Sequence, residues 1–316
     1  MAVATNYGYG VNSEDYTAKV NDIYAMVEKI ARQVLRNVQT VDRLALFDKA
    51  NVDNGTTVEE VVVGLLEAQG FNKNSVKFAE RGLTNLYVKY YSDWTQTQFK
   101  TTTDENDIRK VMLNGGDVSA LAEKIVASLT ESDKQDKYQR ALGLFDYASS
   151  VPTSTDSDYN KANPSTEPRA MIKVGEQIDL TVDGGYKKLL KALKNTVSGM
   201  KFVNETFNKA GLKRSTVGED IVVLMPYKVK NNMDVDELAS IFNLKKDEID
   251  ARIIDIDVDG KIYIVDRNAI LMLTRLYRLT SWLNPEALYM NFWLTVDRMY
   301  AISTLWDCCF IEVKVE

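Results

Sequence analysis

Histidine is absent from all 316 residues of the sequence. Its absence excludes Ser-His and Cys-His nucleophile activation, imidazole metal ligands and the usual general base near neutral pH. A histidine-free enzyme that uses carboxylates or lysines is not excluded by composition, but no carboxylate pair stands in a context that singles it out. The sequence also lacks a glycine-rich phosphate loop, a nucleophile elbow and a zinc-protease motif. We therefore expect no catalytic residues and no cofactor.

Cysteine is nearly absent, with Cys308 and Cys309 adjacent in a segment that predicts a strand. Neighbouring side chains of a strand point to opposite faces, so a disulfide between these two is not expected. We interpret both as packing residues and not as a redox pair.

Long apolar runs are missing as well. No segment approaches the roughly 20 residues that span a bilayer, and no signal-peptide pattern opens the chain, so the first expectation is a cytoplasmic product without a membrane partner. The net charge of −6 argues against a protein whose main task is to grip a phosphate backbone. It fits a soluble particle, or a wall that does not adhere to nucleic acid behind it.

Hydrophobic periodicity organises the first half of the chain. It predicts a helix over 21–39 and a strand over 42–47. A short helix follows, capped by Thr56 or Thr57, with Glu59 or Glu60 completing a capping box. The pattern then predicts an extended segment over 86–102 and one long helix after Asp117, with a weak point near Ser132. The helix over 21–39 could pack on its own domain or on a neighbouring subunit.

The second half begins with a Pro-, Ser- and Thr-rich linker over 150–169. A helix follows, with Leu189, Leu190 and Leu193 on its apolar side and lysines at 187, 188, 191 and 194 on the other. The lysine face could meet DNA, although a solvated lysine face is the more common arrangement. The run DIVVLMP over 220–226 predicts a buried strand.

One motif resembles a calcium loop. Asp255, Asp257 and Asp259 precede Gly260, and Asp266 occupies the twelfth position, where such a loop places a bidentate carboxylate. The residues between the aspartates alternate as in a strand, and Asp-Gly between two such runs favours a hairpin. A calcium loop also needs flanking helices. We therefore expect a hairpin and keep these four aspartates as the weaker metal-site alternative.

Three segments resemble a known family. They are DVDELASIFN from Asp234 to Asn243, IIDIDVDGKIYIVDRNAILM over 253–272, and NPEALYMNFWLTVDRMYAI from Asn284 to Ile302. They resemble the major capsid protein of small short-tailed bacteriophages of the Picovirinae type, whose shells have the HK-ninety-seven-type fold. The order of the upstream elements is similar too, so the resemblance covers about residues 30–315 and is specific after about residue 225.

The resemblance implies an α+β protein with the HK-ninety-seven-type capsid fold. Its parts are an N-terminal arm (1–40), an extended E-loop with a short inserted helix (41–102), a peripheral domain with a long spine helix (103–151), an axial domain (152–266), return strands of the peripheral domain (267–300) and a final strand to the axial domain (301–316). Some relatives carry an immunoglobulin-like domain after this strand; since the sequence ends at Glu316, we expect none here.

The implied function is structural. A major head protein of this kind self-assembles through pentamers and hexamers into the icosahedral shell around a double-stranded DNA genome, becoming part of the virion after assembly in the host cytoplasm. Its implied partners are further copies, scaffolding and portal proteins, and packaged DNA through weak, non-specific contact. The alternatives are an encapsulin-like nanocompartment shell and a calcium-binding interaction module.

Aromatic residues of the E-loop are the candidates for contacts between subunits, because aromatic side chains concentrate at interface anchors. These candidates are Tyr87, Tyr90, Tyr91, Trp94 and Phe99. Each could instead form a local cross-strand pair within its own chain.

Overall fold

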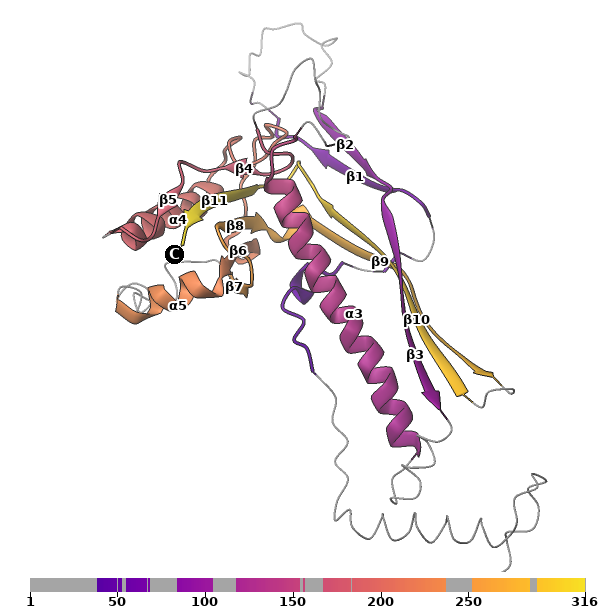
Figure 1. Cartoon of the computed structure of the whole chain (residues 1–316). Coiled ribbons are helices and arrows are strands. Elements are labelled where there is room, and N and C mark those ends of the chain that lie inside the picture. The colour runs from indigo at the N-terminus through magenta and orange to yellow at the C-terminus, as the bar shows by residue number, and fades with distance from the viewer. Residues whose placement is uncertain are drawn as a thin grey trace, which may run out of the picture. The chain divides into compact units, whose positions relative to one another are not determined.

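The computed structural model describes residues 39–49, 51–52, 55–66, 68, 84–104, 118–153, 156, 167–182, 184–236, 252–284 and 289–315. The chain divides into two compact units. The larger unit consists of Asp42–Gln96, Asp136–Leu276 and Asp297–Glu316, and the smaller of Met1–Val41, Thr97–Gln135 and Tyr277–Val296. One helix and several strands contribute residues to both units, and Figure 1 labels the elements along the chain. The helix predicted over 21–39 lies outside the described residues except for Gln39.

A six-stranded sheet forms the centre of the larger unit. Its strands, in sheet order, are β4 (Ile172–Lys173), β11 (Cys308–Lys314), β8 (Lys261–Asp266), β6 (Ile221–Pro226) and β7 (Arg252–Ile256), with β5 (Ile178–Asp179) also paired to β11. Every residue of β6 is buried, as expected for a strand with β-branched side chains covered on both faces. The predicted buried strand DIVVLMP is confirmed.

The two cysteines mark the two faces of this sheet. Cys308 belongs to one hydrophobic cluster and Cys309 to the other, and both thiols are free and buried. The prediction that they pack on opposite faces without a disulfide is confirmed. Burial raises the pKa of both thiols, which disfavours the reactive thiolate.

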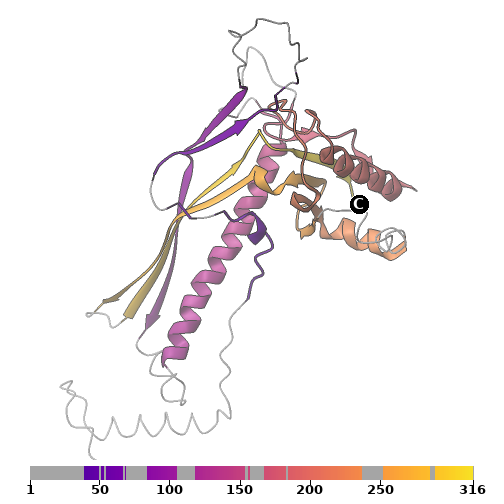
Figure 2. The ribbon, with the colours of Figure 1, turned by 180° about the vertical axis from the view of Figure 1, so that it is seen from behind.

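Helix α4 (Gly185–Lys201) covers the Cys309 face (Figure 2). Its apolar side is buried against the sheet at Leu189, Leu190, Leu193, Val197 and Met200. Lys187, Lys188 and Lys191 are exposed on its other side, so the predicted amphipathic helix is confirmed. Burial of its leucines at about 25 cal/mol per Å² of apolar surface supplies the main force that holds it in place.

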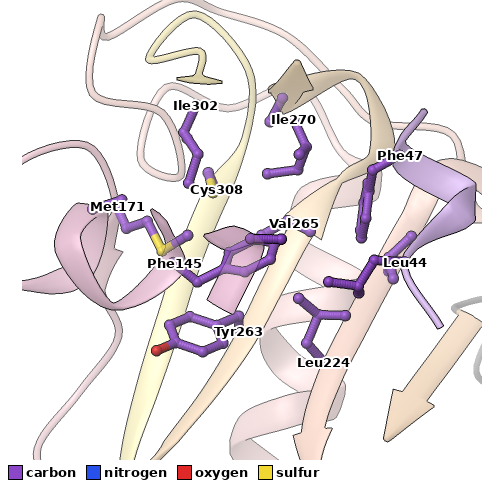
Figure 3. Close-up of a cluster of buried hydrophobic side chains, with 14 of the residues drawn as sticks. Leu44, Phe47, Phe145, Met171, Leu224, Tyr263, Val265, Ile270, Ile302 and Cys308 are labelled. Atoms are coloured by element: carbon purple, nitrogen blue, oxygen red, sulfur yellow. The ribbon is translucent and has the colours of Figure 1, made fainter. Parts of the chain in front are cut away.

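The Cys308 face is covered by the end of a long helix and by a short turn of chain. Phe145 of α3 (Val118–Ser149) lies with its ring centre 5.4 Å from that of Tyr263 in β8 and 6.2 Å from that of Phe47. Figure 3 shows these rings together with Leu44, Met171 and Cys308. These contacts make the turn around Phe47 part of the core of the larger unit.

Helix α3 is continuous over 32 residues. At the predicted weak point, the Ser132 hydroxyl donates to the Ser128 carbonyl one turn earlier, and the helix runs on. One long helix is therefore confirmed, without a break. None of the described helices is both long and apolar enough to cross a bilayer.

Two local predictions in the first hundred residues are wrong. The strand predicted over 42–47 is a 3₁₀ turn, η1 (Ala45–Phe47), which places Leu44 and Phe47 on one side because residues three apart superimpose in this geometry. The short inserted helix predicted after Thr56 is instead a strand, β1 (Val58–Val63). Pairing with β2 (Leu86–Tyr91) decides the conformation of this valine-rich segment, and the capping-box spacing at Glu59 and Glu60 is coincidental.

The predicted hairpin around Gly260 is also wrong. Both predicted strands, β7 and β8, are present, but they do not pair with each other. Strand β6 lies between them, parallel to β7 and antiparallel to β8. The connection over 257–260 therefore crosses the end of β6, a distance of two strand spacings, or about 10 Å. A turn residue is still needed there, and Gly260 has a φ of 87°.

The segment DVDELASIFN from Asp234 to Asn243 falls mostly outside the described residues. Its first three residues end helix α5 (Tyr227–Asp236), which directly follows β6.

The smaller unit contains parts of three long strands. These are β3 (Trp94–Asp104), β9 (Ile270–Asn284) and β10 (Tyr289–Ile302), in the order β3-β10-β9. Within this unit Leu129 of α3 packs against Leu294 and Val296 of β10, with Phe99 and Phe292 beside them. The extended segment predicted over 86–102 corresponds to β2 and β3 and is confirmed.

Candidate functional site

Strands β1 and β2 form a two-stranded antiparallel ribbon, called here the ribbon (Figures 1 and 2). Its register runs from Val58 opposite Tyr91 to Val63 opposite Leu86. Burial alternates along both strands, so the ribbon has an inner, half-buried face and an outer, exposed face.

The outer face is apolar over most of its length. Val61 faces Val88, Val63 faces Leu86, and Tyr90 faces Glu59. The five apolar and aromatic side chains of these pairs are between 41% and 63% exposed. Leu65 and Leu66, directly after β1, are exposed as well. A contiguous exposed apolar surface of this kind marks an interaction site.

The root of the ribbon is held by Trp94 and Arg275. The Trp94 indole N–H donates to the carbonyl of Thr56 at 2.8 Å, which ties the beginning of β3 to the segment that enters β1. The Arg275 guanidinium stacks on the Trp94 ring, donates to the carbonyl of Gly55 at 3.0 Å and pairs with Asp297. We call these five residues the root clamp.

The five aromatic candidates do not share one surface. Tyr90 lies on the outer face, where its hydroxyl donates to Glu59, an interaction that raises the pKa of the tyrosine. Tyr87 is half-buried and Tyr91 buried on the inner face, and Trp94 belongs to the root clamp. Phe99 packs in the core of the smaller unit.

Sequence reasoning missed most of the outer face. The helix predicted after Thr56 hides the strand alternation that exposes Val61 and Val63. In the extended segment over 86–102 the predicted contacts are limited to aromatic residues, which leaves out Leu86 and Val88. The run Val61-Val62-Val63, dense in β-branched residues, was the signal that could have identified a strand.

The four aspartates of the calcium-like motif have separate partners. Asp255 pairs with Lys230 at 2.8 Å and Asp259 with Lys228 at 2.7 Å. The Asp257 backbone N–H donates to the hydroxyl of Tyr138.

Asp266 is buried and pairs with Arg214 at 2.8 Å. Burial raises the pKa of its carboxyl, and the backbone N–H of Asn268 and the charge of Arg214 oppose this rise. In the part of the chain that the structure describes, no three acidic or cysteine side chains gather as metal ligands.

Comparison with known proteins identifies the family. The model of the Phi29-like phage major capsid protein matches residues 5–312. The chain belongs to this family.

Curated relatives within the family are major capsid proteins of phages. That of Bacillus phage GA-1 is 24% identical over 315 residues, which cover 94% of this chain and 61% of that protein. That of Bacillus phage PZA is 20% identical, covering 91% and 62%. The protein of Streptococcus phage Cp-1 is 21% identical and is covered over 85% of its length. The chain thus spans about three fifths of the two Bacillus phage proteins.

Solved capsid structures share the fold. The capsid structure of Staphylococcus phage Andhra superimposes with a TM-score of 0.68 at 14% identity, covering 90% of this chain and 88% of that chain. The capsid structure of Cyanophage P-SCSP1u gives 0.60 at 10% identity, with 91% and 92% covered. The predicted HK-ninety-seven-type capsid fold is confirmed, and these relatives give no support to the encapsulin-like or calcium-binding alternatives.

Proposed function

We propose that this member of the Phi29-like family is a shell subunit of a phage head. Copies assemble through pentamers and hexamers into an icosahedral wall around double-stranded DNA, and the product is part of the virion. The role is mechanical and uses neither a catalytic residue nor a cofactor. Family membership supports the general role, and the exposed outer face of the ribbon carries the proposal for how subunits meet.

The outer face suits a contact with a second copy. A two-stranded ribbon is marginally stable by itself, so covering its second face adds order as well as buried area. Burial contributes about 25 cal/mol per Å² before the entropic costs of association. A contact between this face and a different patch of the next copy is heterologous, and such contacts close by rotation into rings. Tyr90 is the aromatic anchor that we place in this contact.

Other parts of the proposal follow from the resemblance and the charge. Residues 41–102 act as the E-loop, and the ribbon lies within this segment. Assembly takes place in the host cytoplasm with scaffolding and portal proteins. With a net charge of −6, the wall contacts packaged DNA only weakly and non-specifically.

Two valines allow a matched test of the outer face. Val61 and Val182 are exposed to similar extents, 50% and 57%, but Val61 lies on the ribbon and Val182 lies in the turn before α4. The protein is expressed alone and together with the other head proteins of its phage. Size-exclusion chromatography and negative-stain electron microscopy then measure the yield of particles.

We expect shells or sheets of uniform thickness from the parent and from Val182→Lys, and folded, unassembled subunits from Val61→Lys. A lysine in the contact must be desolvated without a partner, which opposes association. A parent that stays monomeric under both conditions contradicts the shell function. Normal particle yield from Val61→Lys contradicts only the role of the ribbon.

A further inference from the structure

Glu60 lies on the inner face of the ribbon and connects it to one loop. Its Oε2 accepts hydrogen bonds from the Tyr91 hydroxyl at 2.7 Å and from the Ser303 hydroxyl at 2.6 Å. Its Oε1 accepts a hydrogen bond from the Trp306 indole N–H at 2.5 Å. Both carboxylate oxygens are therefore used, and two of the three donors belong to the loop over 303–307 between β10 and β11.

Lys89, the cross-strand partner of Glu60, reaches the same loop. Its ammonium donates to the Thr304 hydroxyl at 3.1 Å and lies 5.2 Å from the centre of the Tyr91 ring. Burial lowers the pKa of Lys89, and the negative charge of Glu60 counteracts this effect. One cross-strand pair thus holds three residues of one loop, namely Ser303, Thr304 and Trp306.

The loop is itself fixed to the six-stranded sheet. The Ser303 backbone N–H donates to the carbonyl of Ala269 at 2.7 Å, and the Trp306 ring packs 3.9 Å from the Arg214 guanidinium. Arg214 pairs with the buried Asp266 at the end of β8. Asp307, fully buried, accepts hydrogen bonds from Thr216 and Asn208. Glu60 is therefore bound to a loop that is itself hydrogen-bonded within the larger unit.

Glu60 stands further along the ribbon than the root clamp. The clamp holds Gly55, Thr56 and Trp94, where the chain enters and leaves the ribbon, whereas Glu60 follows Thr56 by four positions within β1. A strand attached only at its root is free to change its inclination. A second attachment away from the root fixes that inclination.

We propose that Glu60 is a positioning residue that latches the ribbon to the loop over 303–307 and so sets the direction in which the outer face is presented to the next subunit. The consequence for assembly rests on the proposed function of that face. The latch itself is a property of the single subunit, and it is tested there.

The test measures the inclination of the ribbon in unassembled subunits. Spin labels are attached to Val63→Cys on the ribbon and Val182→Cys beside α4, both exposed sites in the larger unit. Cys308 and Cys309 are buried and stay unlabelled. Double electron–electron resonance spectroscopy then gives the distribution of the distance between the two spin labels. Glu60→Ala and Glu60→Gln are compared with Glu59→Gln, whose carboxylate bonds to Tyr90 within the ribbon.

We expect a narrow distribution in the parent and in Glu59→Gln, and a shifted and broadened one in Glu60→Ala. Glu60→Gln keeps the shape of the side chain but presents an amide N–H₂ to at least one donor, so it broadens the distribution less. If circular dichroism shows that Glu60→Ala does not fold, the distance distribution of the isosteric Glu60→Gln decides whether the latch exists. An unchanged distribution in a folded Glu60 variant overturns the latch.

Assembly supplies the second readout. Folded Glu60→Gln subunits are expected to form particles of irregular curvature, whereas Val61→Lys subunits form none. If the Glu60 variants change the distance distribution but form normal particles, the role of the latch in assembly is contradicted. If they leave the distance distribution unchanged, the latch itself is contradicted, whatever the particles look like. The two proposals thus fail independently.

Discussion

The guanidinium carbon of Arg275 lies 4.6 Å from the centre of the Trp94 ring. This stacking joins the long strand β9 to the beginning of β3 and, through the Trp94 indole N–H, to Thr56. Trp94 is therefore held within its own subunit, and its effect on assembly is expected to act through the root of the ribbon.

Trp94→Ala tests this role. The substitution removes a half-buried ring, its stacking on Arg275 and one hydrogen bond, and we expect a loss of about 2 kcal/mol in the free energy of unfolding. The subunit stays folded, but particle yield falls because the ribbon root is loosened. Trp94→Phe retains a ring and serves as the milder control. Unchanged particle yield in Trp94→Ala, measured by sedimentation, contradicts this prediction.

Lys137 supports a second prediction, on stability. Its ammonium, buried in α3, pairs with Asp42 at 2.6 Å and with Asp48 at 2.5 Å. Lys137→Met leaves both carboxylates without this partner, and we expect a loss of about 2–3 kcal/mol after allowing for the partial exposure of the aspartates. Urea unfolding measures the change.

Arg140→Met is the matched control for Lys137→Met. Arg140 pairs with Asp136 one turn away on the exposed side of the same helix, an interaction worth about 0.5 kcal/mol or less. Equal losses in the two variants contradict the special role of Lys137.

Glu131 gives a prediction on pH. Hydrogen bonds from Lys134 and from Thr40, through both its hydroxyl and its backbone N–H, lower the pKa of the carboxyl from 4.5 to about 2. A folded-state pKa below the unfolded value stabilises the protein at neutral pH, and this contribution is lost as the pH falls through 4.5 toward 2. The free-energy difference between parent and Glu131→Gln should therefore shrink on acidification. A difference that is constant from neutral pH to about pH 3 would falsify this assignment.

Calcium is expected to have no effect on stability. Asp255 and Asp259 pair with lysines, and Asp266 is buried beside Arg214, so the calcium-like motif does not form a cage. A site at a hundredfold excess of ligand over its Kd stabilises by about 2.7 kcal/mol, which a thermal melt detects readily. We expect equal melting temperatures with millimolar calcium and with a chelator. A clear rise with calcium restores the metal-site interpretation.

The spacing of apolar and polar side chains within one segment predicts correctly those elements whose buried side it marks. The lysine and leucine faces of α4, the buried strand β6 and the opposite orientation of Cys308 and Cys309 follow from side-chain spacing alone. Such patterns report which side of an element meets the core.

Pairing between strands that are distant in the sequence cannot be predicted from the side-chain pattern of either strand. β1 is a strand because β2, more than twenty residues later, supplies its partner, and no pattern within β1 encodes that partner. The same limit explains the hairpin at Gly260, where the insertion of β6 is a property of the whole sheet. The outer face of the ribbon was missed for this reason, and the resemblance to capsid proteins identified the general role without it.

The position of β6 between β7 and β8 has a consequence for how the chain folds. Strands β7 and β8 cannot pair with each other as a local hairpin and form a fast folding nucleus, because β6, an earlier segment, lies between them. The sheet also awaits β11, which lies between β4 and β8 and is the last of its strands to be translated. Such non-local closure is slow. The central sheet of a nascent subunit therefore cannot be completed before β11 has been translated, which delays the appearance of an assembly-competent surface until then.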